Sequence, residues 1–107
     1  MAQTRMQRVG GWGEALAGRF LEARGYTILD RNARTRYGEI DLVARHPDGT
    51  LVFVEVKTRT SLSFGYPEEA VDARKLAHLV SAAEAYLLDH AGLDEPHWRI
   101  DAIAIQG

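Results

Sequence analysis

The stretch GEIDLVARHPDGTLVFVEVKT, residues 38–58, contains two apolar runs separated by a turn sequence. The runs at 40–44 and 51–56 flank the tetrapeptide HPDG at 46–49, a pattern that predicts a β-hairpin. Proline has its φ pre-set for the second position of a type I turn, and glycine at the fourth can take the left-handed conformation that a following bulge needs. We therefore expect a three-residue loop over 47–49 that fixes the register of the two strands.

This register places two acidic residues opposite one another. Counting outward from the turn, Asp41 faces Glu55, and Glu39 faces Lys57. Because side chains alternate along a strand, Glu55 and Lys57 share the face of Phe53, while the intervening valines point the other way. Directly opposed like charges destabilise a sheet, so a cation is expected between the two carboxylates, either the ammonium group of Lys57 or a metal ion.

Length and composition limit the class of protein. A chain of 107 residues is expected to form a single domain, residues 1–107. The absence of cysteine excludes disulfides, thiolate metal sites and thiol nucleophiles. Neither the first 13 residues nor any later run is apolar enough for a signal peptide or a membrane span. We therefore expect a cytoplasmic protein without a membrane partner.

The net charge of −2 conceals an asymmetry along the chain. Residues 1–38 contain seven arginines against three acidic residues, which gives +4, and the remainder carries −6. This pattern favours a basic surface beside an acidic site, as a phosphate-backbone ligand requires, although arginines scattered over solvated faces explain it equally well. An exposed strand edge guarded by charge is a further explanation for the arginines at 30–37. The cations predicted to contact DNA are Arg31, Arg34, Arg36, Arg59, Arg74 and Lys75.

The remaining patterns predict two helices and two further strands. A helix is expected to end at Arg24, after a loose glycine cluster at 10–13. A short strand at 26–29, a helix with one strong apolar stripe at 72–92 and a strand at 98–105 complete the chain. The order of helix, strand, hairpin, helix and strand predicts a small α/β sandwich with a mixed sheet.

Glu14 lies on the inward stripe of the first predicted helix, three residues before Ala17 and seven before Leu21. An acidic residue in a first turn complements the helix dipole, which explains the position of Glu14 along the helix but not its face. The alternative interpretation is a third carboxylate directed at the hairpin site. Both interpretations stay open at this point.

The acidic residues indicate a particular chemistry. Asp41 and Glu55, with Glu14 under its second interpretation, offer only oxygen ligands, which suits a hard cation such as Mg²⁺ or Mn²⁺. Such an ion would activate a water molecule and neutralise charge developing on a phosphate. Lys57 is placed to orient or deprotonate that water and to stabilise an anionic transition state. Phosphodiester hydrolysis uses all of these groups, whereas glycoside cleavage would leave Lys57 without a clear role.

Asp41 followed by Glu55-Val56-Lys57 resembles the D...E-x-K signature of the restriction-endonuclease-like, or PD-(D/E)XK, nuclease superfamily. More closely, the blocks GEIDLVA, FVEVKTR and FGYPEEAVDARK resemble the YraN-like bacterial family, which is itself similar to archaeal Holliday-junction resolvases. The resemblance implies a three-layer α/β core with a mixed central sheet and helices on both faces. It also implies metal-dependent cleavage of branched or structured DNA, and a homodimer.

The resemblance further implies roles for individual residues. Asp41, Glu55 and the backbone carbonyl of Val56 would hold Mg²⁺ or Mn²⁺, Glu14 would contribute through a water molecule, and Lys57 would be the catalytic lysine. Where the superfamily often has proline before the aspartate, this chain has Glu39-Ile40, which leaves the role of Glu39 open. Two rival functions remain: a DNA-binding or scaffold protein without the chemistry, and a purely structural ion cluster.

Overall fold

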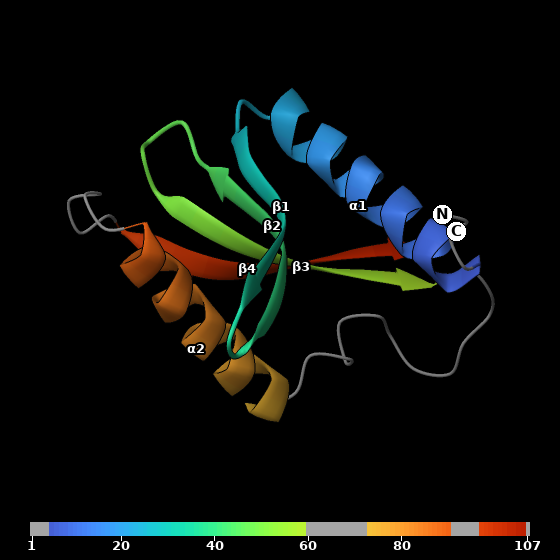
Figure 1. Ribbon diagram of the computed structural model, residues 1–107. Helices are drawn as coiled ribbons and strands as arrows, with labels where there is room; N and C mark the ends of the chain where they lie inside the picture. Colours follow the sequence, from blue (N-terminus) through green and yellow to red (C-terminus); the bar gives the residue numbers. More distant parts are fainter. Residues whose placement is uncertain (1–4, 60–72, 91–96, 107) are drawn as a thin grey trace.

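The computed structural model describes residues 5–59, 73–90 and 97–106, with side chains from Gly11 to Thr58 in the first range. The elements in chain order are α1 (Arg5–Ala23), β1 (Thr27–Thr35), β2 (Gly38–Arg45), β3 (Leu51–Arg59), α2 (Ala73–Asp89) and β4 (Trp98–Gln106). The sheet has the order β1-β2-β3-β4, and only the β3–β4 pair is parallel. The two helices lie on opposite sides of this sheet (Figure 1). The predicted three-layer α/β sandwich with a mixed sheet is confirmed.

Both faces of the sheet are buried because β3 is apolar on both sides. The cluster beneath α2 comprises Ala33, Ile40, Val43, Leu51, Phe53, Ala82, Ala83 and Tyr86. The cluster beneath α1 comprises Ala17, Leu21, Leu42, Ala44, Val52, Val54 and Val56. The alternation predicted for β3 is therefore confirmed, and it assigns one helix to each face. In the described part of the chain, neither helix combines the length and the apolar character needed to cross a bilayer.

The turn between β2 and β3 has the predicted register. Arg45 pairs with Leu51, and the N–H of His46 donates to the carbonyl of Thr50 at 2.9 Å. Gly49 closes the turn with a φ of +96°, and its N–H donates to the His46 carbonyl at 2.8 Å. The three-residue loop over 47–49 therefore sets the strand pairing as expected.

The first helix begins earlier than predicted. It starts at Arg5 and runs through the glycine cluster, so the prediction of a loose segment at 10–13 is wrong. At Gly13, the glycine within the helix is explained by a close approach to the sheet, because a Cβ there would collide with Oγ1 of Thr58 on β3. A glycine costs a helix about 1 kcal/mol relative to alanine, and here the close approach to β3 explains why that cost is tolerated.

β1 is longer than predicted and forms an edge of the sheet. The prediction ended this strand at residue 29 and treated 30–37 as a basic segment, with a charged strand edge as the alternative; pairing with β2 continues to Thr35, as that alternative requires. The strand is irregular: its register shifts between Ile28 and Asp30, and Asn32 has a φ of +51°. The arginines at 31 and 34 therefore lie along an exposed edge.

Candidate active site

The site is located where β2 and β3 separate. Their paired ladder ends at Leu42 and Val54, after which β2 continues beside β1 and β3 beside β4. Figure 1 shows the β1–β2 end bending toward α2 while β3 and β4 run on together. At the point of separation, Oδ2 of Asp41 accepts a hydrogen bond from the N–H of Val56 at 2.8 Å. The Asp41 carboxylate thus accepts from the Val56 N–H, which lies beyond the last paired residue of the β2–β3 ladder.

The separation overturns one prediction, the pairing of Glu39 with Lys57. Glu39 pairs instead with Arg34 on β1, and Arg34 Nε lies 3.7 Å from Glu39 Oε2. On its other side, Glu39 lies with Glu14 and Asp41, and one carboxylate oxygen from each of the three lies within 4.8 Å of the others. The alternation of side chains along a strand, which puts Glu39 on the face of Asp41, was the available signal for this grouping.

Asp41 and Glu55 lie one position beyond the last paired residues of the β2–β3 ladder, so the predicted pairing itself is absent, but their carboxyl groups still interact. Glu55 is 7% exposed and is the only charged residue that is buried among those described. Burial raises the pKa of Asp41 to about 7; the Val56 N–H opposes this rise, and the charges of Glu55 and Glu14 add to it. A hydrogen bond between the Asp41 and Glu55 carboxyl groups acts in the same upward direction. The Asp41 carboxyl group therefore keeps its proton to a higher pH than an exposed aspartate does.

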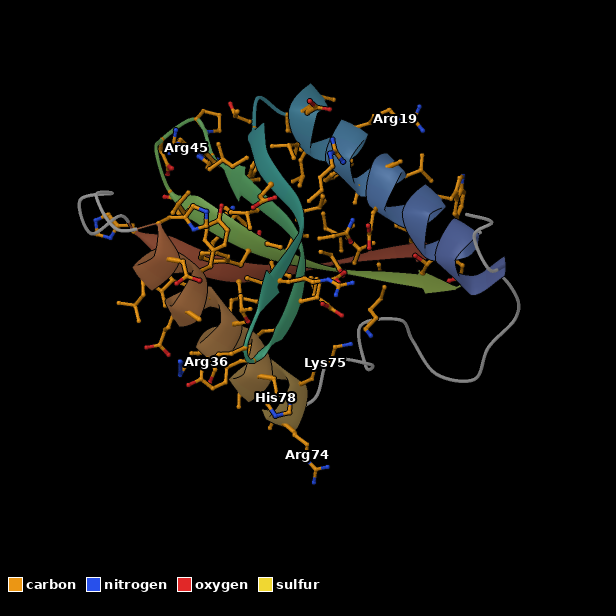
Figure 2. All side chains as sticks on the ribbon, in the orientation of Figure 1. Arg19, Arg36, Arg45, Arg74, Lys75 and His78 are labelled. Carbon is orange, nitrogen blue, oxygen red and sulfur yellow. The ribbon has the colours of Figure 1, made fainter. Side chains whose placement is uncertain are left out.

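Two ammonium groups converge on Glu55. Nζ of Lys57 lies 3.4 Å from Glu55 Oε1, and Nζ of Lys75 lies 2.8 Å from the same oxygen. Figure 2 shows Lys75 directed from α2 toward the sheet, whereas the neighbouring Arg74 points away. The hydrogen bond with Lys75, followed by burial, lowers the pKa of Lys57. Burial lowers the pKa of Lys75 too, but its contacts with Glu55 and Lys57 outweigh this, and the net shift is upward.

α1 and β1 bring a further pair of groups to the site. Burial raises the pKa of Glu14, and a hydrogen bond from Asn32 counteracts part of that rise. With its amide oriented to satisfy its surroundings, the Asn32 nitrogen lies 3.0 Å from Glu14 Oε2 and 3.0 Å from Glu39 Oε1. Asn32 was not among the predicted site residues, because nothing in its local pattern signals a contact between a strand and a distant helix.

The predicted DNA-contact cations divide into three groups. Lys75 and Arg31 lie at the carboxylates: a Cβ on Gly18 of α1 would meet Arg31 Nη1 at 2.8 Å, and the Arg31 charge lowers the pKa of Glu14 after the larger effects of burial and Asn32. Arg34 lies beside Glu39, as described. Two further cations lie away from the carboxylates: Arg36 lies over the ring of Tyr37, 5.7 Å from its centroid, and Arg74 is exposed. The side chain of Arg59 is not among those described.

A cavity of about 250 Å³ opens onto the site from the α2 side. Its lining comprises Tyr37, Gly38, Glu39, Asp41, Glu55, Lys75, His78, Leu79 and Ala82. Glu39, Asp41, Glu55 and Lys75 belong to the site, and all four carry ionisable groups. The arrangement can therefore accept a charged ligand group beside the carboxylates.

The fold is similar to that of a solved nuclease. The crystal structure of a repair endonuclease from Pyrococcus abyssi superposes with a TM-score of 0.54 at 13% identity, covering 100% of this chain and 41% of that one. At this identity the likeness concerns the fold alone, and the present chain spans less than half of that protein. The chain thus has an α/β fold similar to that of this repair endonuclease.

Sequence comparison identifies the family. The chain matches the Uncharacterised protein family UPF0102 over residues 13–105 and belongs to it. A UPF0102 protein of Roseiflexus castenholzii is 48% identical over 101 residues, covering 94% of this chain and 81% of the relative. One of Syntrophomonas wolfei is 56% identical over 81 residues, covering 76% and 70%. The predicted family is confirmed.

Proposed function

We propose that this protein is a Mg²⁺- or Mn²⁺-dependent endonuclease that hydrolyses phosphodiester bonds in DNA. The observation that carries the proposal is the meeting of Asp41, Glu55 and Lys57 where β2 and β3 separate. The nuclease-like fold supports it. Branched or structured DNA is the proposed substrate, because the sequence blocks resemble a family similar to junction resolvases. A homodimer, implied by the same resemblance, would present two such sites and is testable by light scattering.

The donor set fits a hard divalent cation. Every available donor is oxygen: the carboxylates of Asp41 and Glu55, the Val56 carbonyl, and Glu14 directly or through a water molecule. Burial, together with the charges of Glu55 and Glu14, raises the pKa of Asp41, and a divalent ion would stabilise the charged carboxylate against these effects. When bound, such an ion would acidify a water molecule and neutralise charge on the phosphate.

The lysines provide the proton-handling and anion-binding groups. Lys57, two residues beyond Glu55 and 3.4 Å from its Oε1, is proposed to orient the attacking water or to accept a proton from it. Lys75, whose pKa is raised, stays charged and suits stabilisation of an anionic phosphate. Arg31 and Arg34, along the β1 edge, are proposed to contact neighbouring backbone phosphates. Each group thus has a role that its surroundings favour.

The test is cleavage of labelled four-way, flap and single-stranded DNA with Mg²⁺ or Mn²⁺. Wild type should cut at least one substrate, and Asp41→Asn and Lys57→Met should each lose activity by about 100-fold or more, the effect typical of removing one transition-state contact. Asp48→Asn, in the exposed β2–β3 turn, is the matched control and should cut like wild type. Equal cleavage by Asp41→Asn, or none by wild type, contradicts the proposal.

One observation favours a non-catalytic alternative. Glu55 already has both lysines as counter-ions, so the cluster can be stable without metal or chemistry. A DNA-binding or scaffold protein of this kind would bind DNA in a salt-dependent manner without metal-dependent cleavage. Calorimetry that shows no Mn²⁺ uptake, together with unchanged DNA binding by an Asp41→Asn, Glu55→Gln and Lys57→Met triple variant, would select a purely structural ion cluster.

A further inference from the structure

Lys75 supplies the shorter of the two ionic contacts to Glu55. Its Nζ lies 2.8 Å from Oε1, compared with 3.4 Å for Lys57. The Lys75 side chain is 32% exposed and the Glu55 side chain 10%. A carboxylate this deeply buried requires a counter-charge. In the metal-free protein, Lys75 therefore provides the nearest cation to an oxygen that the proposed metal would use.

A divalent ion and the Lys75 ammonium group cannot lie against the same carboxylate oxygen without strong repulsion. Lys57 lies farther from this oxygen, at 3.4 Å against 2.8 Å for Lys75, so an ion at Glu55 would repel Lys75 more strongly. Lys75 also reaches the site from the first turn of α2 through a flexible four-carbon stem. Metal binding at Glu55 should therefore displace Lys75 rather than Lys57.

The displaced Lys75 ammonium group could move into the neighbouring cavity. Lys75 already lines the cavity of about 250 Å³ that opens onto Asp41 and Glu55. A divalent ion, two lysines and the neighbouring Arg31 and Arg34 carry six positive charges against the four carboxylates of the site, Glu14, Glu39, Asp41 and Glu55. The excess of about two positive charges would attract an anion such as a phosphodiester. Arg74 cannot substitute, because it points away from the sheet (Figure 2).

We infer that Lys75 is an exchangeable counter-ion, which neutralises Glu55 in the metal-free protein and contacts the substrate phosphate once a divalent cation binds Glu55. This assignment rests on the proposed function and adds a catalytic residue to it. It links metal binding to DNA binding: the metal frees the lysine, and the lysine then favours the phosphate. By reciprocity, bound DNA should tighten metal binding through Lys75.

The test compares Lys75→Met, Lys75→Arg and the control Arg45→Met in the full chain; Arg45 is an exposed cation at the end of β2 remote from the carboxylates. Calorimetry with Mn²⁺ alone should show tighter binding by Lys75→Met, by about 5-fold or more, because a competing cation has been removed. With DNA and Mn²⁺, the same variant should lose about 10-fold or more in kcat/KM, chiefly through KM. Lys75→Arg should restore part of kcat/KM, and Arg45→Met should match wild type in both measurements.

Three results separate the outcomes. Unchanged or weaker Mn²⁺ binding by Lys75→Met overturns the competition with metal, and unchanged kcat/KM overturns the phosphate contact, while the proposed function stands. A wild-type protein that neither binds Mn²⁺ nor cuts DNA overturns both the proposed function and this assignment. If Lys75→Met folds poorly, Lys75→Gln serves in its place, because it keeps a hydrogen-bond donor for Glu55 without the charge. Lys75→Gln must then bind Mn²⁺ more tightly than wild type and show a lower kcat/KM.

Discussion

The two halves of the β2–β3 pair are held together in different ways. In the closed half, residues 42–45 and 51–54, the strands form a continuous ladder, and all side chains except that of Arg45 are buried. In the open half, residues 38–41 and 55–58, the strands part and the Asp41 carboxylate bonds the Val56 N–H. The closed half is apolar apart from Arg45, and the open half carries the acids and Lys57.

This difference shows how one hairpin can serve both stability and chemistry. Apolar side chains on a paired ladder gain from burial on both faces of the sheet. Like charges in the open half oppose folding, and they are tolerated where separated strands leave room for lysines and for the Asn32 amide. Substitutions in the closed half should therefore change stability, while those in the open half should change metal binding and its pH dependence.

The largest effect is expected in the closed half, for Phe53→Ala. Phe53 is 1% exposed and packs edge-on against Tyr86 and Trp98, with ring centroids 5.7 Å apart in each pair. Removing a buried aromatic ring costs about 3–5 kcal/mol, which urea denaturation would measure. Leu88→Ala, at a site 78% exposed, is the control and should stay within about 0.5 kcal/mol of wild type. A loss below about 1 kcal/mol for Phe53→Ala would contradict the contrast.

The open half should instead make the free energy of unfolding fall as pH rises, the opposite of what an aspartate with a lowered pKa does. Burial raises the pKa of Asp41 from 3.8 to about 7, so the folded protein keeps a proton that the unfolded chain loses above about pH 4. The free energy of unfolding of the metal-free protein should therefore fall as pH rises from about 4 to about 7. We expect a fall of about 2 kcal/mol relative to Asp41→Asn, roughly half of the full shift because the site is partly open to solvent.

Asp48, at the turn, provides the control for this measurement. The Thr50 backbone N–H lowers the pKa of Asp48 to about 2, so its stabilising effect is present above about pH 4 and is lost only at lower pH. Asp48→Asn should consequently leave the slope between about pH 4 and 7 unchanged. Saturating Mn²⁺ should reverse the slope, because metal binding requires the charged carboxylate. Equal slopes for wild type and Asp41→Asn would show that Asp41 titrates normally.

The closed half was predictable from sequence because its signals are local. The HPDG turn, with its proline and glycine, fixes the register, and the alternation along 51–56 assigns each side chain to a helix-covered face. The meeting of Asp41 with Glu55 was predicted by extending that register one position beyond Leu42 and Val54, where the observed ladder ends. Glu14 on the inward stripe of α1 is a similar case, since helical spacing determines its face.

The open half was less predictable because its contacts join distant segments. The strands part after Leu42 because β1 continues beside β2 and β4 beside β3, which no pattern within the hairpin encodes. Lys75 reaches Glu55 from a helix 20 residues later in the chain, so the sequence predicted a DNA contact for Lys75 but not its ion pair with Glu55. The glycines at 10–13 were predicted to form a loose segment because glycine disfavours helix. At Gly13 this preference is outweighed, because only glycine allows the helix to lie so close to Thr58 on β3.

Smaller changes are expected at Asn32, where stability should report on backbone strain and Mn²⁺ affinity should report on the positioning of Glu14 and Glu39. Its amide bonds Glu14 and Glu39 from a left-handed conformation, φ +51°, which glycine adopts freely and alanine resists. Asn32→Gly should be more stable than Asn32→Ala by about 1 kcal/mol. Both variants should nevertheless bind Mn²⁺ roughly 10-fold more weakly, the loss typical of removing a partner that orients metal ligands. Urea denaturation and calorimetry supply the two readouts.

Thr27→Ala is the matched control for Asn32. Thr27 is exposed at the start of the same strand and pairs with Arg45, at the end of β2 remote from the carboxylates. It should leave Mn²⁺ binding unchanged. If Asn32→Gly regained wild-type metal affinity along with its stability, the residue would serve only the shape of the backbone.

The smallest expected effects test how α1 is seated over the open half. A Cβ added at Gly11 would meet nothing within 4 Å, whereas a Cβ at Gly13 would collide with Thr58 Oγ1. Alanine is the better helix former by about 1 kcal/mol, so Gly11→Ala should stabilise the protein by up to that amount in thermal unfolding. At Gly13 the collision should reverse the sign and cost about 1 kcal/mol net.

The companion variant Gly13→Ala with Thr58→Ala should recover most of that loss, because the second change removes the hydroxyl oxygen that the new methyl group meets. Gly13 directly precedes Glu14, so a shift of α1 would also move a carboxylate away from Asp41 and weaken Mn²⁺ binding in the single variant. If Gly13→Ala were as stabilising as Gly11→Ala, the close approach to Thr58 would not hold the helix, and the position of Glu14 would need another cause.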